Sequence, residues 1–581
     1  MRKAKIVCTL GPASADRETV GALAAAGMAV ARVNASHGTP EDRAALIERA
    51  QAVDAAVDGP VATMLDLRGP EVRTAAIDEP VTLATDSEVR FEPGQTATSE
   101  VVGVAVPLDG VSVGDRVLLD DGRIESTVTA VDDSAVVARV DAGGELGSRS
   151  GVNVPGAALD IEAVTDRDRA DLGMAAEHGV DFVAASFVRS AADVLAVGEA
   201  LEAHDASIPI VAKVERAEAV ENLEGIVGAA EGVMVARGDL GVECPLEEVP
   251  LIQKRIVRRC QRAGVPVIIA TEMLDSMIHG RRPSRAEASD VANAVLDGAD
   301  AVMLSGETAV GEHPVGVVET MDRIVREVEA SEEHAELAEQ RVPPAGDSAT
   351  GALARSARYL ARDVGARAIV VASETGYTAL KVAKFRPGVP IVAATPDDRV
   401  RRQLALSWGV TPVSADLAAG GAAAVIENAV GSAVDAGMVD SGDTVVVLSG
   451  MMTQLERSTT NTLKVHVATE TLAAGRGVVP GRVAGPLARS ADGDLEPVPD
   501  GAILYLPAAF DGELAGDPGR LAGIVHGRPG MTGYPAMVAR ELGLPMASGV
   551  DLPADVEAGR TVTLDGERGV VYAGDVAGRP P

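Results

Sequence analysis

Apolar runs recur along the first 308 residues, and a stretch with helical character follows each of them. Val, Ala, Ile and Met fill these runs continuously, without alternating with polar residues. Continuous runs are expected of parallel strands that are buried on both faces. Eight such strands close a (β/α)8 barrel. We predict the barrel strands at 5–10, 28–34, 61–67, 182–188, 209–215, 232–239, 266–273 and 301–308.

The pattern changes between the third and fourth runs. Residues 75–153 lack helical periodicity, are rich in Val, Thr, Asp and Gly, and carry turn signals at Asp121-Gly122 and Gly143-Gly144. They predict a small all-β domain inserted in a βα loop. A polar, proline-containing segment at 334–346 reads as a linker behind the barrel.

Further domains are predicted behind this linker. Runs at 368–373, 390–395 and 444–450 restore the βα alternation and predict an open α/β domain. From Gly475 onward Gly, Pro and Asp become frequent, and apolar runs at 502–507 and 523–527 predict a fourth, smaller domain. The expected fold class is α/β, with a TIM (β/α)8 barrel at 1–74 and 154–340, an inserted β-barrel lid at 75–153, an open α/β domain at 345–470 and an extra domain at 475–581.

Charge narrows the choice of partners. The formal net charge is −34, and only seven of the 52 basic residues are Lys. A strongly acidic surface argues against nucleic acid or an anionic membrane as a partner. An acidic tail would also give this charge, but Asp and Glu are spread along the whole chain. Dispersed acid with little Lys is typical of a halophilic protein, because salt screens the self-repulsion.

Several features predict a cytoplasmic globular protein. Apolar residues make up 46% of the chain, but no run of eighteen apolar residues occurs, so no membrane span is expected. The first predicted strand begins at residue 5, which leaves no room for a signal peptide. Cys8, Cys244 and Cys260 have no metal-binding spacing, as expected in a reducing compartment.

Polar residues gather at the carboxyl ends of the predicted barrel strands. Those ends form the face on which catalytic loops meet in a (β/α)8 barrel, so their clustering predicts an enzyme. Two carboxylates and an ammonium in this set can hold a divalent cation beside an anionic substrate, which is the outline of a phosphoryl-transfer site. The residues are Arg32, Asn34, Asp66, Lys213, Glu215, Asp239, Thr271, Ser305 and Glu307.

The main candidates also have simpler interpretations. Lys213 ends an apolar strand and would serve equally as a structural lysine whose ammonium reaches solvent. Glu215 and Asp239 could be ordinary surface acids, and Thr271 a hydroxyl that bonds the backbone at a strand end.

A set of ordered segments resembles the pyruvate kinase family. The order, the spacing and the inserted β domain agree over about residues 1–470. The resemblance implies a glycolytic transferase that moves the phosphoryl group of phosphoenolpyruvate to ADP. The segments are 7-VCTLGPAS-14, 32-RVNASHG-38, 65-LDLRGPEVR-73, 151-GVNVPG-156, 211-VAKVE-215, 236-ARGDLGVE-243, 270-ATEMLDSM-277, 283-PSRAEASDVANAVLDGAD-300 and 303-MLSGET-308.

The resemblance assigns roles around the substrate. It implies that Arg32 and Lys213 bind the phosphoryl group, with Lys213 as the catalytic charge clamp, and that Glu215 and Asp239 hold Mg²⁺ or Mn²⁺. The backbone of Arg237, Gly238 and Asp239 would receive the substrate carboxylate. Thr271 would lie near the enolate, where a water relay is expected because a threonine hydroxyl is a weak acid. Glu272 stands where the family commonly has glutamine.

A monovalent-cation site is also implied. Asn34, Ser36, Asp66 and the carbonyl of Leu67 match the K⁺ ligands of the family. Glu71 resembles the K⁺-dependent subtype, since independent members carry lysine there and a fixed ammonium replaces the ion.

For the nucleotide, Pro12, His37 and Arg73 match the ADP side of the family's site. His37 would also fit a half-buried structural histidine. The inserted domain is expected to close as a lid that excludes water. Arg149 and Ser150 stand in its return segment where the family often has two lysines, which weakens the charge of the lid.

The α/β domain contains a loop that binds sugar-phosphate effectors in activated family members. Here the loop contains Ser373, Glu374, Thr375, Gly376 and Thr378, and 457-RSTTN-461 forms a second polar loop. Glu374 places a negative charge where a phosphate would bind, so we expect no activation by fructose 1,6-bisphosphate. The family also implies a homotetramer.

The tail resembles the swivelling phosphohistidine domain of phosphoenolpyruvate-utilising enzymes, on the stretch 523-GIVHGRPGMTGYPAMVARELGLPMASG-549. Tyr534 occupies the position of the active histidine, and His526 lies eight residues earlier. A structural or regulatory role is therefore expected for this domain.

Three functions remain open from the sequence. An active pyruvate kinase accounts for every motif. A phosphoenolpyruvate synthase or phosphotransferase would explain the tail, but Tyr534 argues against it. A catalytically inactive effector-binding or scaffold protein is the non-enzyme alternative, which the intact Lys213, Glu215, Asp239 and Thr271 disfavour.

Overall fold

The computed structural model describes residues 2–57, 59–132, 135–157, 159, 161–417, 421–450 and 460–578. Its internal contacts divide the chain into two units, each described here by itself. One contains Met1–Gly346, Ala379–Gly388 and Asp397–Pro412, and the other contains Asp347–Thr378, Val389–Pro396 and Val413–Pro581. The domain boundaries expected from the sequence stay predictions.

The first unit is built on a closed parallel barrel, which confirms the predicted fold class. Neighbouring strands follow the order β1-β16-β15-β14-β13-β12-β3-β2. Their side chains are almost all buried, as their continuous apolar sequences require. The barrel strands are β1 (Lys5–Thr9), β2 (Val30–Asn34), β3 (Ala62–Asp66), β12 (Phe182–Ala185), β13 (Ile210–Val214), β14 (Gly232–Ala236), β15 (Val267–Ala270) and β16 (Ala301–Leu304).

Of the predicted strands that were extended too far, two continue as helices in the structure. The run 232–239 ends as a strand at Ala236, and Arg237–Glu243 forms the short helix α7. The run 301–308 ends at Leu304, and Gly306–Ala309 forms α10. In both places the chain turns from strand into helix at the carboxyl edge of the barrel, so Asp239 and Glu307 lie on helices.

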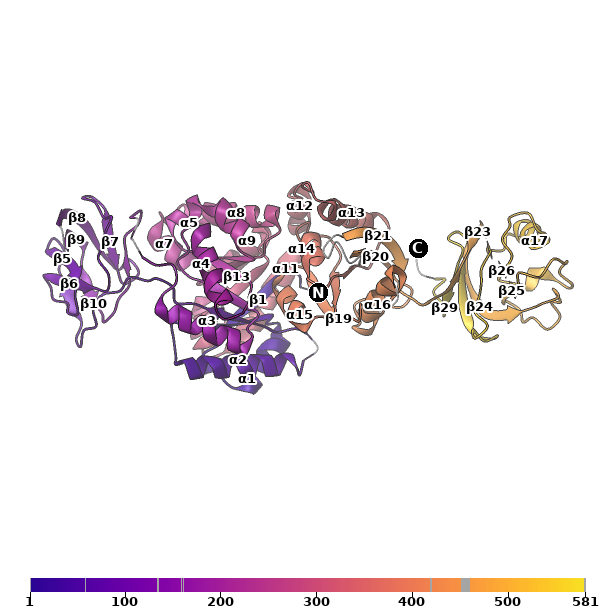
Figure 1. Ribbon diagram of the computed structural model, residues 1–581, viewed down its shortest axis with the longest axis horizontal. Helices are drawn as coiled ribbons and strands as arrows, with labels where there is room; N and C mark the ends of the chain where they lie inside the picture. The colour runs from indigo at the N-terminus through magenta and orange to yellow at the C-terminus, as the bar shows by residue number, and fades with distance from the viewer. Residues whose placement is uncertain are drawn as a thin grey trace. The chain divides into compact units, whose positions relative to one another are not determined.

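Helices surround the barrel strands (Figure 1). One of them, α9, has the termini that its sequence predicts: Ser284 caps it in a reciprocal capping box with Glu287, and Gly298 ends it at φ 101°. Besides α7 and α10, the helices around the barrel are η1 (Pro12–Ser14), α1 (Arg17–Ala26), α2 (Pro40–Asp54), α3 (Asp166–His178), α4 (Ala191–Glu202), α5 (Ala217–Glu221), α6 (Leu223–Ala229), α8 (Val249–Ala263), η2 (Asp275–Ile278), α9 (Arg285–Asp297), α11 (Pro314–Glu329) and α12 (Glu332–Gln340).

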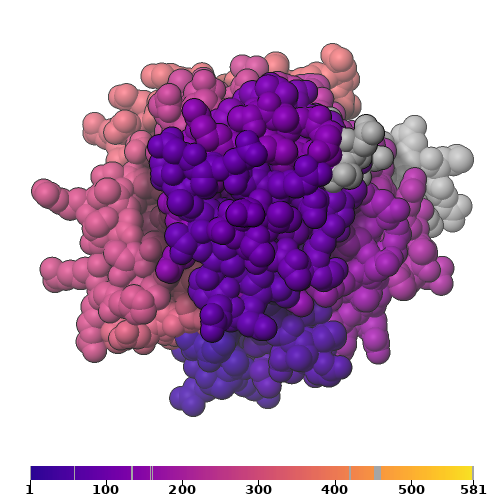
Figure 2. All heavy atoms as spheres, turned by 90° about the vertical axis from the view of Figure 1, so that its left-hand side faces the viewer, coloured from indigo at the N-terminus to yellow at the C-terminus, as the bar shows by residue number. Residues whose placement is uncertain are grey.

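The inserted region is all-β among its described residues. A six-stranded sheet, with the order β11-β7-β8-β9-β5-β6, encloses a core around Phe91 and is accompanied by the pair β10-β4. Figure 2 views the molecule from the side of this domain, drawn in violet. The strands are β4 (Val81–Leu83), β5 (Glu88–Pro93), β6 (Val101–Val104), β7 (Arg116–Leu119), β8 (Ile124–Asp132), β9 (Ala135–Ala142), β10 (Gly144–Leu146) and β11 (Val152–Asn153).

A segment that follows the barrel in sequence closes its amino-terminal end. Ala405 and Leu406, in the turn η3 (Leu404–Leu406), pack with the residues that fill the barrel interior. Buried carboxylates at this end pair with arginines of the same segment: Arg386 with Asp300, Arg401 with Asp54 and Arg402 with Asp181. We call Ala379–Gly388 and Asp397–Pro412 the base segment.

The second unit contains two sheets. The α/β sheet has the strand order β19-β18-β17-β20-β21, in which β17 is parallel to β18 and β20, and β21 is antiparallel to β20. Strands β19 and β21 were not predicted from the sequence. Its elements are α13 (Ala349–Asp363), β17 (Ala368–Ala372), β18 (Ile391–Thr395), α16 (Ala422–Asp435), β20 (Thr444–Gly450) and β21 (Thr460–Val467). The residues of α14 (Tyr377–Ala383) and β19 (Val410–Ser414) are divided between the two units, and α15 (Asp398–Gln403) belongs to the base segment of the first.

The C-terminal sheet has eight strands in the order β22-β29-β28-β24-β25-β26-β27-β23. Its parallel pairs β24–β25, β25–β26 and β26–β27 are flanked by antiparallel ones. The elements are β22 (Thr471–Ala474), β23 (Arg476–Val479), β24 (Arg482–Arg489), β25 (Ile503–Leu506), η4 (Pro518–Arg520), β26 (Gly523–His526), α17 (Tyr534–Leu542), β27 (Met546–Ser548), β28 (Thr561–Asp565) and β29 (Val570–Ala573). Among the described residues of the whole chain, no helix is both long and apolar enough to cross a membrane.

Candidate active site

A cavity of about 260 Å³ opens at the carboxyl ends of the barrel strands. Most of the residues predicted from the sequence line it, although they come from distant parts of the chain. Asp66 is fully buried and contacts Arg32 and Lys213, which line the cavity. The predicted residues in the lining are Arg32, Asn34, Ser36, His37, Leu67, Glu71, Arg73, Lys213, Glu215, Asp239, Thr271 and Ser305.

Lys213 is the central cation of this cavity. Its Nζ lies 2.9 Å from Glu215 Oε1 and 3.3 Å from Asp66 Oδ1. Burial lowers the pKa of Lys213, but the charges of Asp66 and Glu215 outweigh it and raise the pKa above its usual value. The lysine is therefore held charged by partners in the site and does not extend into solvent, which removes the simpler interpretation.

Arg32 supplies a second buried cation. Its Nε donates to Asp66 Oδ2 at 2.7 Å, and its Nη1 donates to the Thr9 hydroxyl at 2.8 Å. Burial raises the pKa of Asp66, but the charges of Lys213 and Arg32 hold it below its usual range. Two fixed cations thus flank one ionised carboxylate at the bottom of the cavity.

Glu215 and Asp239 provide the carboxylates predicted for a divalent cation. Glu215 is 1% exposed, and its Oε2 accepts the backbone N–H of Phe187 at 2.7 Å. Burial and the charge of Glu215 raise the pKa of Asp239 to about 7. Repulsion between neighbouring carboxylates is what a bound cation relieves, so these residues fit Mg²⁺ or Mn²⁺.

No group of three or more Asp, Glu, His or Cys side chains able to hold a metal occurs among the residues described by the structure. Two carboxylates leave most coordination positions to substrate and water. That pattern is typical of Mg²⁺, which commonly uses one or two carboxylates plus phosphate oxygens.

Thr271 lies in a strained backbone segment. Its φ is +68° and that of Glu272 is +53°, a region that β-branched residues rarely adopt. The Thr271 hydroxyl donates to the Ala270 carbonyl at 2.7 Å and accepts the Gly238 N–H at 2.8 Å. The hydroxyl proton is therefore already engaged with the backbone.

Arg237 contacts the same segment. Its guanidinium donates to the carbonyl of Ala270 at 3.2 Å and of Thr271 at 2.9 Å, and to Asp290 Oδ1 at 2.7 Å. The side chain of Arg237 thus supports Thr271, and only its backbone is left for the contact with substrate carboxylate predicted from the sequence.

The residues predicted for K⁺ lie at the ends of two neighbouring strands, where Asn34 of β2 is in register with Asp66 of β3. Asn34 Oδ1 accepts the N–H of Ser36 at 3.0 Å, and the Leu67 carbonyl accepts a hydroxyl at 2.7 Å. Glu71 pairs with Arg73, whose Nη2 lies 2.7 Å away. A carboxylate, an amide oxygen, a hydroxyl and a carbonyl are the hard donors that K⁺ requires, so this set fits the ion.

The nucleotide residues are only partly gathered. His37 is exposed, which removes the half-buried structural interpretation, and Arg73 lines the cavity. Pro12 is exposed at the start of η1 and is not among the lining residues. Arg149 is exposed, and its carbonyl accepts Arg73 Nη1 at 2.9 Å.

Sequence reasoning missed Ser186 and Asp121, which also line the cavity. Ser186 was assigned to the interior of the run 182–188, but β12 ends at Ala185 and Phe187 takes φ +56°. Asp121 comes from a turn of the inserted domain, which only the folded structure brings to the cavity.

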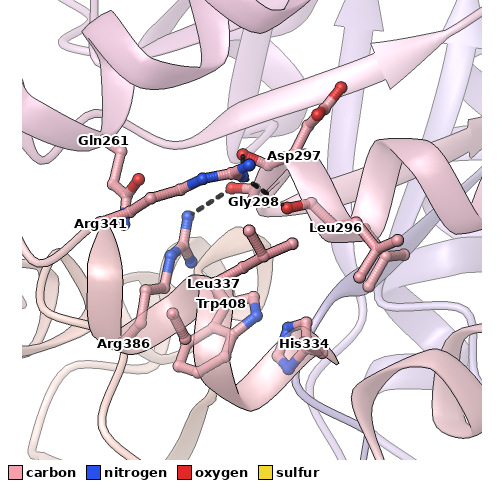
Figure 3. Close-up of a pocket in the computed structure, with 11 residues that line it drawn as sticks. Gln261, Leu296, Asp297, Gly298, His334, Leu337, Arg341, Arg386 and Trp408 are labelled. Carbon is pink, nitrogen blue, oxygen red and sulfur yellow. Dashed lines mark hydrogen bonds between the residues drawn. The ribbon is translucent and has the colours of Figure 1, made fainter. Parts of the chain in front are cut away.

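A second, much smaller cavity, of about 20 Å³, lies among α9, α12 and the base segment (Figure 3). Arg341 donates to the Leu296 carbonyl at 2.7 Å, and Arg386 donates to the Gly298 carbonyl at 2.8 Å. Both guanidinium groups are thus engaged by the protein, and none of the residues predicted for catalysis lines this cavity.

Two predicted features lie in the second unit. Ser373, Glu374, Thr375 and Gly376 form the loop between β17 and α14, with Glu374 exposed, and Thr378 Oγ1 lies 2.6 Å from Thr460 Oγ1. Positions 457–459 of the second polar loop lie outside the described residues. In the C-terminal domain Tyr534 begins α17, whereas His526 is 7% exposed in β26 with its ring edge against Phe510.

A closed (β/α)8 barrel with an inserted β domain, and with a charged lysine between carboxylates at its mouth, is typical of enzymes that transfer phosphoryl groups. The comparisons with known proteins give the particular family. The chain belongs to the pyruvate kinase family: residues 1–318 match the family model described as the pyruvate kinase barrel domain, and residues 351–466 match its alpha/beta domain. Residues 498–569 match the mobile domain of PEP-utilising enzymes.

Individual relatives agree with this assignment. The chain is 42% identical to a pyruvate kinase of Geobacillus stearothermophilus over 583 residues, covering 99% of each chain. It is 39% identical to one of Bacillus licheniformis, again over 99% of each. A solved pyruvate kinase from Cryptosporidium parvum superposes with a TM-score of 0.75 at 34% identity, covering 80% of this chain and 96% of that one. The bacterial relatives thus extend over the C-terminal domain as well.

Proposed function

We propose that this chain is an active pyruvate kinase, which transfers the phosphoryl group of phosphoenolpyruvate to ADP and forms pyruvate and ATP. The observation that carries the proposal is Lys213 Nζ, buried at 2.9 Å from Glu215 and 3.3 Å from Asp66 at the mouth of the barrel. An inactive scaffold would not need to keep a charged ammonium in a buried cavity.

The proposed transfer breaks the bond between phosphorus and the enol oxygen and forms one to the terminal phosphate oxygen of ADP. Lys213 and Arg32 are fixed cations that stabilise negative charge on the transferring group. The enolate left behind takes a proton at C3. Because the Thr271 hydroxyl already donates to Ala270, we propose that a water beside Thr271 delivers that proton.

Glu215 and Asp239 would hold the divalent cation, which supplies positive charge next to the substrate oxygens when bound. Asn34, Ser36, Asp66 and the Leu67 carbonyl would hold K⁺. Glu71 supports K⁺ dependence, since no lysine at this position supplies a fixed ammonium in place of the ion.

We assign the cytoplasm as the compartment, in keeping with the three free cysteines. A net charge of −34 supports adaptation to high salt. We also propose that the protein is a homotetramer and binds neither nucleic acid nor membranes. Light scattering after size exclusion tests the oligomeric state.

A lactate-dehydrogenase-coupled assay for pyruvate tests the function, with phosphoenolpyruvate, ADP, Mg²⁺ and molar KCl. We expect an ADP-dependent rate in the wild type and a loss of about 10³-fold or more in kcat for Lys213→Met, because a preorganised cation is removed. Lys254→Met is the matched control, since Lys254 pairs with Asp297 on α8 and α9, away from the cavity. No rate in a folded wild-type protein, or equal losses in both variants, contradicts the proposal.

We propose that fructose 1,6-bisphosphate does not activate the enzyme. Glu374 is exposed in the loop between β17 and α14 and would repel a phosphate at short range. The half-saturating phosphoenolpyruvate concentration should stay constant when the sugar is added, and Glu374→Thr tests whether the carboxylate is the cause. A large decrease in the wild type would refute this expectation.

For the C-terminal domain we propose a structural or regulatory role in place of phosphohistidine chemistry. Tyr534 cannot carry a phosphoryl group as an imidazole would, and His526 is only 7% exposed in β26, where its ring is poorly accessible to a phosphoryl donor. Incubation with labelled phosphoenolpyruvate should leave no acid-labile phosphate on this domain.

A further inference from the structure

Ser186 connects groups of the mouth that the sequence assigned to separate tasks. It is the first residue after β12 and is 6% exposed, and its hydroxyl faces the cavity. Lys213 Nζ donates to Ser186 Oγ at 2.7 Å. Ser186 Oγ in turn lies 2.7 Å from the Leu67 carbonyl and 3.2 Å from Asp66 Oδ1.

The direction of these bonds follows from the chemistry of a hydroxyl. Serine has one proton to donate, and the Lys213 ammonium can only donate. The oxygen therefore accepts from Lys213, and its proton goes to the nearer acceptor, the Leu67 carbonyl. The result is a directed chain from the Lys213 ammonium through the Ser186 hydroxyl to the Leu67 carbonyl, in which each bond polarises the next.

The local backbone conformation keeps Ser186 in place for these hydrogen bonds. Phe187 adopts φ +56°, which lets its N–H reach Glu215 while Ser186 faces the mouth. Gly69, at φ +75°, lies against Ser186 so closely that a Cβ at position 69 would stand 2.9 Å from the Ser186 Cβ. The hydrogen bond from Phe187 to Glu215 and the close approach of Gly69 thus fix the backbone around Ser186, which limits the directions in which its hydroxyl can point.

The two groups joined by these hydrogen bonds, Lys213 and the Leu67 carbonyl, have different roles in the proposed function. Lys213 acts on the transferring phosphoryl group, whereas the Leu67 carbonyl and Asp66 belong to the set that would hold K⁺. A carbonyl oxygen has two lone pairs, so Leu67 can accept from Ser186 and still bind a cation. A cation at Leu67 polarises this carbonyl, and Ser186 is the hydrogen-bonded link from Leu67 to the ammonium. It acts beside the direct contact of Asp66 with Lys213 at 3.3 Å.

We propose that Ser186 is a positioning residue that couples the monovalent-cation site to the orientation of Lys213. This inference rests on the proposed function, since it assumes that Lys213 acts on a phosphoryl group. It predicts that loss of the hydroxyl weakens the response to K⁺ and the catalytic rate together, while both sets of ligands stay in place.

The test compares Ser186→Ala with Ser186→Cys, which keeps a weak donor and acceptor of similar size. For Ser186→Ala we expect kcat to fall about tenfold or more and the half-activating K⁺ concentration to rise by a similar factor, because a hydrogen bond to a charged group is lost. Ser186→Cys should lie between the alanine variant and the wild type. Ser126→Ala is the matched control, since Ser126 is a buried serine whose hydroxyl donates to the Val117 carbonyl at 2.9 Å in the inserted domain.

A binding readout separates this inference from the kinase activity itself. The rise in melting temperature caused by KCl, relative to LiCl at equal ionic strength, reports K⁺ binding without turnover. This K⁺-specific rise should shrink in Ser186→Ala and persist in Ser126→Ala. If it persists undiminished in Ser186→Ala and the half-activating K⁺ concentration is unchanged, the coupling is refuted, even where kcat falls.

Remaining outcomes are also decisive. A wild type that binds K⁺ but makes no pyruvate refutes the proposed function, whereas a smaller K⁺-specific rise in Ser186→Ala would still support the hydrogen-bonded link. If Ser186→Ala fails to fold, Ser186→Cys decides, since wild-type K⁺ response in that variant with a weakened hydrogen bond contradicts the inference.

Discussion

The two ends of the barrel bury similar charges but arrange them differently. At the amino-terminal end Asp300 receives both Nη atoms of Arg386 at 2.9 Å, together with the N–H groups of Val267 and Trp408. At the mouth Asp66 pairs with Lys213 and Arg32, and Glu215 pairs with Lys213, whereas burial and repulsion by Glu215 raise the pKa of Asp239 to about 7. One end matches each carboxylate with a cation, and the other leaves negative charge unmatched.

The difference shows what each end is for. Buried charges that are already paired and hydrogen-bonded fix the arrangement of the elements that carry them. They can bind a ligand only if their existing ion pairs break. Unmatched carboxylates destabilise the protein until a cation arrives, which makes them suited to binding. The strained φ values of Phe187 and Thr271 add to this cost at the mouth.

The largest effect on stability is expected at the amino-terminal end. Arg386→Met leaves the buried carboxylate of Asp300 without its cation and should lower the free energy of unfolding by about 3–5 kcal/mol. At a temperature where the variant is folded, kcat should change less than about twofold, because Arg386 does not line the cavity at the mouth. Denaturant unfolding and the coupled assay measure the two quantities.

The control for that experiment is Arg362→Met. Arg362 and Asp363 are each 62% exposed, so their pair should contribute no more than about 0.5 kcal/mol. If both arginine variants unfold at the same denaturant concentration as the wild type, the amino-terminal end is not held by its buried ion pairs.

Asp239→Asn, at the mouth, should change stability in the opposite sense to Arg386→Met. Removing one of two repelling carboxylates should raise the free energy of unfolding by about 1 kcal/mol in Mg²⁺-free buffer at pH 8, while kcat falls about 10²-fold or more. The raised pKa gives the sign, because an ionised Asp239 is disfavoured in the folded state. Melting curves with and without Mg²⁺ check it: stabilisation by the cation should occur in the wild type and be lost in the variant.

The last effect, on the pH dependence of stability alone, concerns His334, which lines the cavity beside the base segment (Figure 3). Burial, with the charges of Lys3 and Arg386, lowers its pKa to about 4. A histidine with a lowered pKa contributes stability above its unfolded value of about 6.5, and this contribution is lost as the pH falls toward 4. Between pH 7 and 5 the wild type should lose about 1–2 kcal/mol more than His334→Gln. Parallel losses in the two proteins would show that His334 is not the group involved.

Much of the fold could be predicted because its signals are local. Each barrel strand is a continuous apolar run, and the capping box of Ser284 and Glu287 is read from residues three apart. The chemistry of the mouth was predictable in the same way, since polar residues that end successive parallel strands must meet at one edge of the sheet. The base segment was not, because Arg402 and Asp181 are separated by 221 residues and neither stands in a distinctive local pattern.

The sequence by itself determined the barrel, the inserted β domain, the family and the identity of most side chains at the mouth. Only the tertiary structure decided how those side chains share their charges, that Arg237 supports Thr271, that Ser186 joins Lys213 to Leu67, and that residues 397–412 close the barrel. The physical reason is that periodicity and capping depend on neighbours along the chain. Hydrogen-bond direction, burial and charge balance depend on atoms that only folding brings together.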